Sequence, residues 1–114
     1  MNKELHSLQI PTGFKIVKNE FYNYDPETEF NKEDSFYCLQ EDILQFEFNN
    51  LVIDLGWYGD TETNDGNFRL VVIFDYNWDE PLKKIVSKSG IAIKNELNNL
   101  LMELYFQKIV HNKM

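Results

Sequence analysis

Asp54 and Asp75 are the residues of this 114-residue chain whose types and spacing come nearest to a catalytic or metal site. Each lies on the less apolar face of a run with alternating hydrophobicity, and a hairpin between the runs would let the two carboxylates approach one another. Adjacent carboxylates can hold a divalent metal or separate their pKa values for acid and base catalysis. The spacing supplies no third ligand. We therefore favour solvated carboxylates, one of them paired with Arg69, over a small metal-dependent enzyme.

Other catalytic groups are scarce in the sequence. Its two histidines, His6 and His111, lie near the termini, where we expect frayed chain that would hold a general base poorly. No glycine-rich phosphate loop, paired-histidine metal motif or nucleophile elbow occurs. The lone Cys38 has no partner for a disulfide or a thiolate metal site, and we expect a buried core thiol. The sequence thus predicts no enzyme, no cofactor and no metal.

Alternating hydrophobicity predicts two hairpins that position these residues. Runs 44–48 and 51–58 flank Asn49-Asn50, a dipeptide that tolerates positive φ. Runs 51–58 and 68–76 flank the loop Gly59–Gly66, in which Asp65-Gly66 is the strongest turn signal. The last two runs are apolar on one face and mixed on the other, which indicates central strands covered at least partly on both sides.

Weaker patterns extend the sheet on both sides. Residues 14–17 form a short strand, and the polar residues 27–35 form a loop or one short helix. The lysine-rich run 81–88 reads as an edge strand, because lysines discourage aggregation at edges. A helix capped by Ser87 or Ser89 then runs to about Val110 with a leucine stripe.

The predicted fold class is α+β: an antiparallel β-meander of four to five strands with a long C-terminal helix packed on one face. An apolar fraction of 43% and the length of 114 residues suit one folded domain, residues 1–114. The expected core comprises Leu44, Phe46, Ile53, Leu55, Trp57, Leu70, Val72 and Phe74 of the strands, and Leu97, Leu100, Leu101 and Leu104 of the helix.

Charge is unevenly distributed along the chain. The net charge is −8, but residues 20–80 hold 16 carboxylates against Lys32 and Arg69, which gives −14, whereas the segments before and after carry +2 and +4. Such a block repels nucleic acid and anionic membranes, and it attracts a basic partner and speeds encounter with it. Solubility alone would explain the total but not the segregation.

Aromatic side chains are expected beside this charge, at one end of the sheet. We expect Trp57 to lie in the core, and Tyr58, Tyr76 and Trp78 to lie near the loop or the strand exit. Aromatic anchors next to complementary charge are the usual composition of a binding hot spot. The pattern therefore favours a protein-binding surface at that end.

Three stretches carry a resemblance to a known family: "IPTGFKIVKNEFYNYDP", "EDILQFEFNNLVIDLGWYGD" and "FRLVVIFDYNWDEPLKKIVSKS". Over residues 10–88 the chain resembles small bacterial immunity proteins of contact-dependent growth inhibition systems. The most specific parts are "NEFY" with the following "DP", "IDLGWY" and "NWDEP". Members of this family are cytoplasmic antitoxins, inhibitors of the toxic C-terminal domains that neighbouring cells deliver.

The resemblance implies a cognate toxin domain as partner, and it carries over no set of functional residues. Many such toxins are nucleases with basic clefts, which would explain the acidity of this chain. Charge and aromatic placement, rather than the resemblance, select the contact residues around the loop 59–66, with a second tier at a neighbouring loop. These predicted partner-binding residues are Tyr58, Asp60, Glu62, Asp65, Asp75, Tyr76, Trp78, Asp79, Glu27 and Glu29.

Two other function classes stay open at this point. The first is an acidic adaptor or regulatory domain without a toxin partner, and the second is the metal-dependent enzyme built on Asp54 and Asp75. No run approaches the roughly 18 apolar residues of a membrane span. Residues 1–13 lack the apolar centre of a signal peptide, so we expect a cytoplasmic protein.

Overall fold

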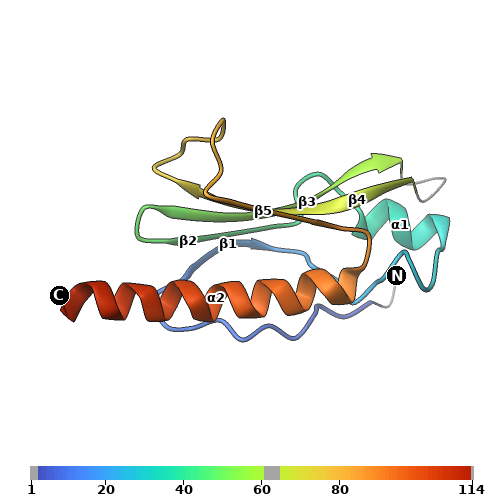
Figure 1. Cartoon of the computed structure of the whole chain (residues 1–114). Helices are drawn as coiled ribbons and strands as arrows, with labels where there is room; N and C mark the ends of the chain where they lie inside the picture. The colour runs from blue at the N-terminus through green and yellow to red at the C-terminus, as the bar shows by residue number, and fades with distance from the viewer. Residues whose placement is uncertain (1–2, 61–64, 114) are drawn as a thin grey trace.

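A five-stranded antiparallel sheet with one long helix across a face forms the protein in the computed structural model, which describes residues 3–60 and 65–113 (Figure 1). The strands follow one another in sequence order across the sheet, as a meander. The α+β prediction is confirmed. The elements are β1 (Lys15–Asn19), α1 (Lys32–Cys38), β2 (Leu44–Phe48), β3 (Leu51–Asp60), β4 (Asp65–Phe74), β5 (Lys83–Ser87) and α2 (Gly90–Lys113).

Both predicted hairpins form, and the second is longer than expected. Phe48 pairs with Leu51, so Asn49-Asn50 is the two-residue turn, with Asn49 at a φ of 57°. The β3–β4 ladder extends to the pair Asp60 and Asp65. The prediction of a turn at Asp65-Gly66 is wrong, because both residues belong to β4 and continue the ladder. The connection itself lies outside the described residues.

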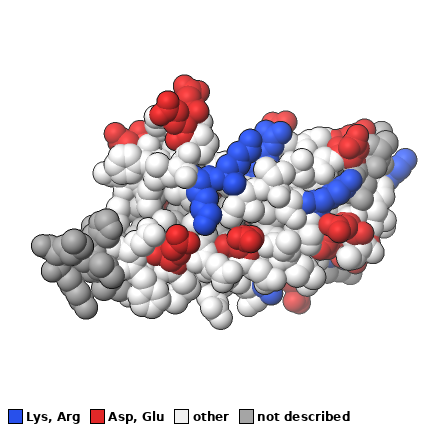
Figure 2. Space-filling view, in the orientation of Figure 1, with Lys and Arg blue, Asp and Glu red and all other residues white. Residues whose placement is uncertain are grey.

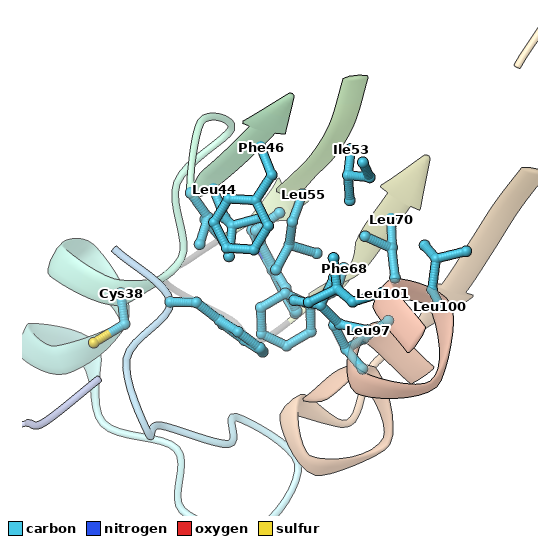
Figure 3. Close-up of a cluster of buried hydrophobic side chains, with 14 of the residues drawn as sticks. Cys38, Leu44, Phe46, Ile53, Leu55, Phe68, Leu70, Leu97, Leu100 and Leu101 are labelled. Atoms are coloured by element: carbon cyan, nitrogen blue, oxygen red, sulfur yellow. The ribbon is translucent and has the colours of Figure 1, made fainter. Parts of the chain in front are cut away.

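The core fills the space between α2 and the sheet face that bears the apolar stripe of β2, β3 and β4 (Figure 3). The predicted strand residues and Leu97, Leu100 and Leu101 are buried, whereas Leu104 is half-buried at the border of the core. Trp57 is buried with its ring 5.0 Å from that of Phe68, in an edge-to-face arrangement. Alternation along the strands therefore located most of this core correctly.

Phe74 is the exception, since it is 50% exposed. It ends β4 opposite Leu51, the first residue after the β2–β3 turn. At this end of the sheet an open groove of about 410 Å³ lies between the strands and α2, and Leu51, Phe74, Leu82 and Leu104 line it. Alternation along β4 correctly placed Phe74 on the sheet face that packs against α2. It could not show that the packed core ends before Phe74.

Helix α2 begins at a cap shared by two distant segments. Ser89 Oγ accepts a hydrogen bond from the Ala92 N–H at 3.1 Å, so Ser89 is the N-cap that the sequence offered. The buried Asp25 carboxylate accepts bonds from Ser89 Oγ and the Ile91 N–H, both at 3.2 Å. A carboxylate at this end also complements the helix dipole. Asp25 thereby ties the segment before α1 to α2.

Helix α1 is short and is anchored on one side only. The Asn31 side chain caps it by accepting from the N–H groups of Glu33 and Asp34. Ser35 and Cys38 are buried, and the Ser35 hydroxyl lies 2.6 Å from that of Tyr24. Cys38 is the core thiol that we expected, and burial raises its pKa to about 11.

A turn and loop cover part of the other sheet face, above the sheet in Figure 1. Asp75 and Tyr76 have φ values of 53° and 59°, and the Asn77 N–H donates to the Phe74 carbonyl at 3.1 Å, so residues 74–77 form a type I′ turn. Tyr76 Oη donates to Glu47 Oε2 at 3.0 Å. The ladder aligns Glu47 with Val52 and Ile73, which are both buried. The Tyr76 side chain therefore reaches from the end of β4 back to β2.

Candidate functional site

The described partner-binding residues predicted in β3, in β4 and just after β4 divide between opposite ends of the sheet. Asp60 and Asp65 form the last pair of the β3–β4 hairpin, and Tyr58 is two positions before it. Tyr76 and Trp78 follow the other end of β4, together with Asp75 and Asp79. Ten residues of β4 span roughly 33 Å. The expectation that Tyr58, Tyr76 and Trp78 gather at one end is therefore wrong, and Glu62 lies outside the described residues.

The proposed carboxylate pair is also separated. Asp54 pairs with Val71, whereas the Asp75 N–H donates to the Asn50 carbonyl at 2.8 Å. Asn50 and Asp54 are four residues apart, which amounts to roughly 13 Å along a strand. Within residues 3–60 and 65–113, no three His, Cys, Asp or Glu side chains are grouped to hold a metal. The idea of a site built on both aspartates is wrong.

Asp54 is nevertheless an unusual carboxyl group. It is half-buried on the face opposite α2, and burial, assisted by the charge of Asp42, raises its pKa to about 6. A raised pKa in one isolated carboxyl group gives neither an acid–base pair nor a metal ligand set.

One end of the molecule combines carboxylates from two segments. The backbone N–H of Trp57 donates to the backbone carbonyl of Gln40 at 2.7 Å, so the chain after α1 runs beside β3 near the hairpin end. A Cβ atom at Gly56 would collide with the Glu41 carbonyl oxygen, so the close approach requires glycine there. Helix α1 consequently lies next to the end of the β3–β4 hairpin (Figure 1). We call residues 27–42 together with Asp60 and Asp65 the acidic end.

Few carboxylates of the acidic end are neutralised by a neighbour. Glu29 pairs with Lys3 at 3.1 Å, and Asp42 pairs with Lys18 at 3.2 Å. Five further carboxylates of the acidic end form no salt bridge with a described residue: Glu27, Glu33, Asp34, Glu41 and Asp65. The second-tier residues Glu27 and Glu29 belong to the segment that leads into α1.

Two aromatic residues that the sequence analysis did not select are exposed among these charges. Phe36 is 66% exposed and Tyr37 is 50% exposed on α1, with ring centroids 5.4 Å apart at an interplanar angle of 89°. They point outward because Ser35 and Cys38 take the inward positions of the helix. The Asn31 cap would have located this helix and hence its outer face.

Tyr58 lies at the border of the acidic end. It is half-buried, and its ring lies under the Arg69 guanidinium, with 4.7 Å between the guanidinium carbon and the ring centroid. Burial raises the pKa of Tyr58, and the neighbouring Asp54 charge acts in the same direction. The arginine covers one face of the ring, so less of Tyr58 is open to contact than of Phe36 or Tyr37.

His6 is held firmly, contrary to the expectation of a frayed terminus. The backbone N–H of His6 donates to the Phe21 carbonyl at 2.8 Å, and the centroid of its ring lies 4.3 Å from that of the Phe21 ring. The residue is only 7% exposed, and burial lowers its pKa to about 4. A neutral, enclosed imidazole supports packing, and no carboxylate hydrogen bond orients it for proton transfer.

Comparisons with protein-family models, with curated proteins and with solved structures found no match for this chain. Among the helices of the described residues, none is both long enough and apolar enough to cross a membrane.

Proposed function

We propose that this protein binds and neutralises a basic protein domain, in the manner of the immunity proteins that its sequence resembles. One observation carries the proposal: the acidic end presents largely unneutralised carboxylates around the exposed pair Phe36 and Tyr37. Charge of one sign steers a partner of the other sign, and buried aromatic side chains then slow its departure. The proposed role is binding in the cytoplasm without catalysis.

A nuclease toxin is the partner class that best suits this surface. Its active cleft must be basic to hold phosphate groups. Carboxylates of the acidic end would occupy positions that phosphates take in the substrate, and the two rings would bury apolar area against the rim. Inhibition would then follow from exclusion of the nucleic acid, with no chemical step on the immunity protein.

Binding kinetics against a basic toxin domain encoded next to this gene would test the proposal. Neutralising three carboxylates by Glu33→Gln, Glu41→Gln and Asp65→Asn should lower the association rate and flatten its dependence on salt. Phe36→Ala and Tyr37→Ala should act on dissociation, with about 2 kcal/mol lost at the better anchor. Both rings are exposed, so neither change should disturb the fold.

A matched control removes the same charge from the opposite end of β4, by Asp75→Asn, Asp79→Asn and Glu80→Gln. This triple variant should bind with nearly unchanged rates. Equal losses in both triple variants would mean that only net charge matters, and a larger loss in the control would move the interface to the loop after β4. No association between the wild type and the toxin domain would favour the adaptor alternative.

A further inference from the structure

Basic side chains meet on the sheet face opposite α2, in a protein whose net charge is −8. The ladder pairs Arg69 of β4 with Val86 of β5, and Lys84 precedes Val86 by two residues, so all three share a face. Lys88 directly follows the last residue of β5. These four residues are exposed, and we call them the basic patch.

Within the part of the chain that the structure describes, no salt bridge neutralises the charges of the basic patch. On the same strand, Lys83 forms a salt bridge of 3.7 Å with Glu103 of α2. Arg69, Lys84 and Lys88 make no salt bridge to any residue that the structure describes. The Arg69 guanidinium carbon lies 4.7 Å from the centroid of the Tyr58 ring, and a guanidinium group presents a planar fork of N–H donors that suits a carboxylate.

An apolar side chain lies between these cations. Val86 is 49% exposed, although it sits on an ordered strand with charged residues around it. Figure 2 shows basic side chains gathered over the region of β5 in this view, with acidic groups around them on several sides. Like charges held together without counterions cost electrostatic free energy, and a bound anionic group would relieve that cost.

We propose that the basic patch is a docking surface for a carboxylate-rich segment of another protein. Acidic side chains of the segment would meet Arg69, Lys84 and Lys88, and an apolar side chain between them would cover Val86. Charge complementarity carries the choice of partner, because the acidic end suits a basic domain and this face suits the opposite sign. The proposal holds whether or not the acidic end binds a toxin.

Lysines at a sheet edge also keep other edges away, and this effect is consistent with the proposed partner. Two copies that met through their β5 edges would bring their lysine-rich strands together. The basic patch therefore disfavours an edge of a second copy, while it attracts an acidic segment.

The test uses a fluorescein-labelled peptide in which glutamate alternates with leucine, titrated with the whole protein at low and high salt. We expect salt-sensitive binding, with amide shift changes in NMR spectra at Arg69, Lys84 and Val86. Lys84→Gln with Lys88→Gln should weaken binding about five- to ten-fold. The matched pair Lys15→Gln with Lys18→Gln, on the opposite edge, should change it less than about two-fold.

Three results would overturn the proposal. The first is absence of binding at millimolar peptide, and the second is equal weakening by both lysine pairs, which would reduce the effect to net charge. The third is a dimer of the wild type in sedimentation that Lys84→Gln with Lys88→Gln dissolves, since the occupant would then be a second copy. Phe36→Ala should leave peptide binding unchanged, which separates this surface from the acidic end.

Discussion

The acidic end and the basic patch occupy the same sheet and differ in how their charges are assembled. Carboxylates of the acidic end come mostly from one continuous segment, residues 27–42, which α1 and the close approach at Gly56 hold against the hairpin. The basic patch joins Arg69 to lysines that follow it by 15 residues or more, and only the β4–β5 register brings them together. One surface depends on a docked helix, and the other depends on strand pairing.

The largest expected effect is a loss of stability when the hydrophobic core beneath both surfaces is disturbed. Leu55 is fully buried and lies in the core between the sheet and α2. Leu55→Ala should lower the free energy of unfolding by about 2–5 kcal/mol, because the core would keep a cavity. Urea denaturation measures the loss. Leu82→Ala, at a residue 65% exposed, is the control and should change stability by less than about 0.5 kcal/mol.

Acid should loosen the N-terminal segment that backs the acidic end. Burial lowers the pKa of His6 from its ordinary 6.5 to about 4. Between these pH values His6 is protonated in the unfolded chain and neutral in the folded protein. The free energy of unfolding therefore falls as the pH falls from 6.5 to 4, by up to about 3 kcal/mol. His6→Phe keeps a ring against Phe21 and removes the titration. Unfolding measured across this range should lose that slope in the variant, and an unchanged slope would rule His6 out as its source.

The attachment of α1 can be disturbed without changing the strand register. Gly56→Ala should cost about 1–3 kcal/mol, because the new methyl group meets the Glu41 carbonyl oxygen. Hydrogen exchange should accelerate in residues 32–42 and stay nearly constant in β5. Glu41→Ala is the matched control, since it keeps the backbone oxygen and should be close to neutral. Faster exchange throughout the sheet would show that the two surfaces do not depend on separate supports.

Sequence patterns predicted the sheet, the long helix and most of the core because alternation and helical periodicity are local signals. They did not show that the predicted site residues lie at two opposite ends of the sheet, because that depends on the antiparallel pairing of β3 with β4. The end of β3 meets the start of β4, so residues that follow β4, such as Trp78, lie far from Tyr58. Phe36 and Tyr37 escaped notice because the polar segment before them gave no firm helix boundary.

The basic patch was hidden for a related reason. Along the chain, Arg69 belongs to the strongly acidic block, and Lys84 and Lys88 belong to the basic flank. Counting charge by segment therefore assigned them to different regions. Pairing of Arg69 with Val86 depends on the length of the loop after β4, which local hydrophobicity does not encode.

Asp54 marks the border between the two surfaces and gives the smallest of these effects. It pairs with Val71, so Arg69 is its diagonal neighbour on the same face, while Asp42 of the acidic end adds like charge. Burial and Asp42 raise the pKa of Asp54 from its ordinary 3.8 to about 6. Between these values the folded protein holds a proton that the unfolded chain releases, so this group lowers stability as the pH rises from 3.8 to 6.

Asp54→Asn should therefore stabilise the protein at pH 7 by about 1–2 kcal/mol, after allowance for the partial exposure of the carboxyl group. The gain should shrink as the pH falls through 6 and vanish below about 4, where the carboxyl group is protonated in both states. Asp65→Asn, at the exposed hairpin end, is the control and should change stability by less than about 0.5 kcal/mol. An NMR titration of the Asp54 carboxyl carbon decides the cause: a midpoint near 6 would show that burial, assisted by the charge of Asp42, dominates, whereas a midpoint below 4 would mean that Arg69 governs it and that the basic patch already has a carboxylate partner.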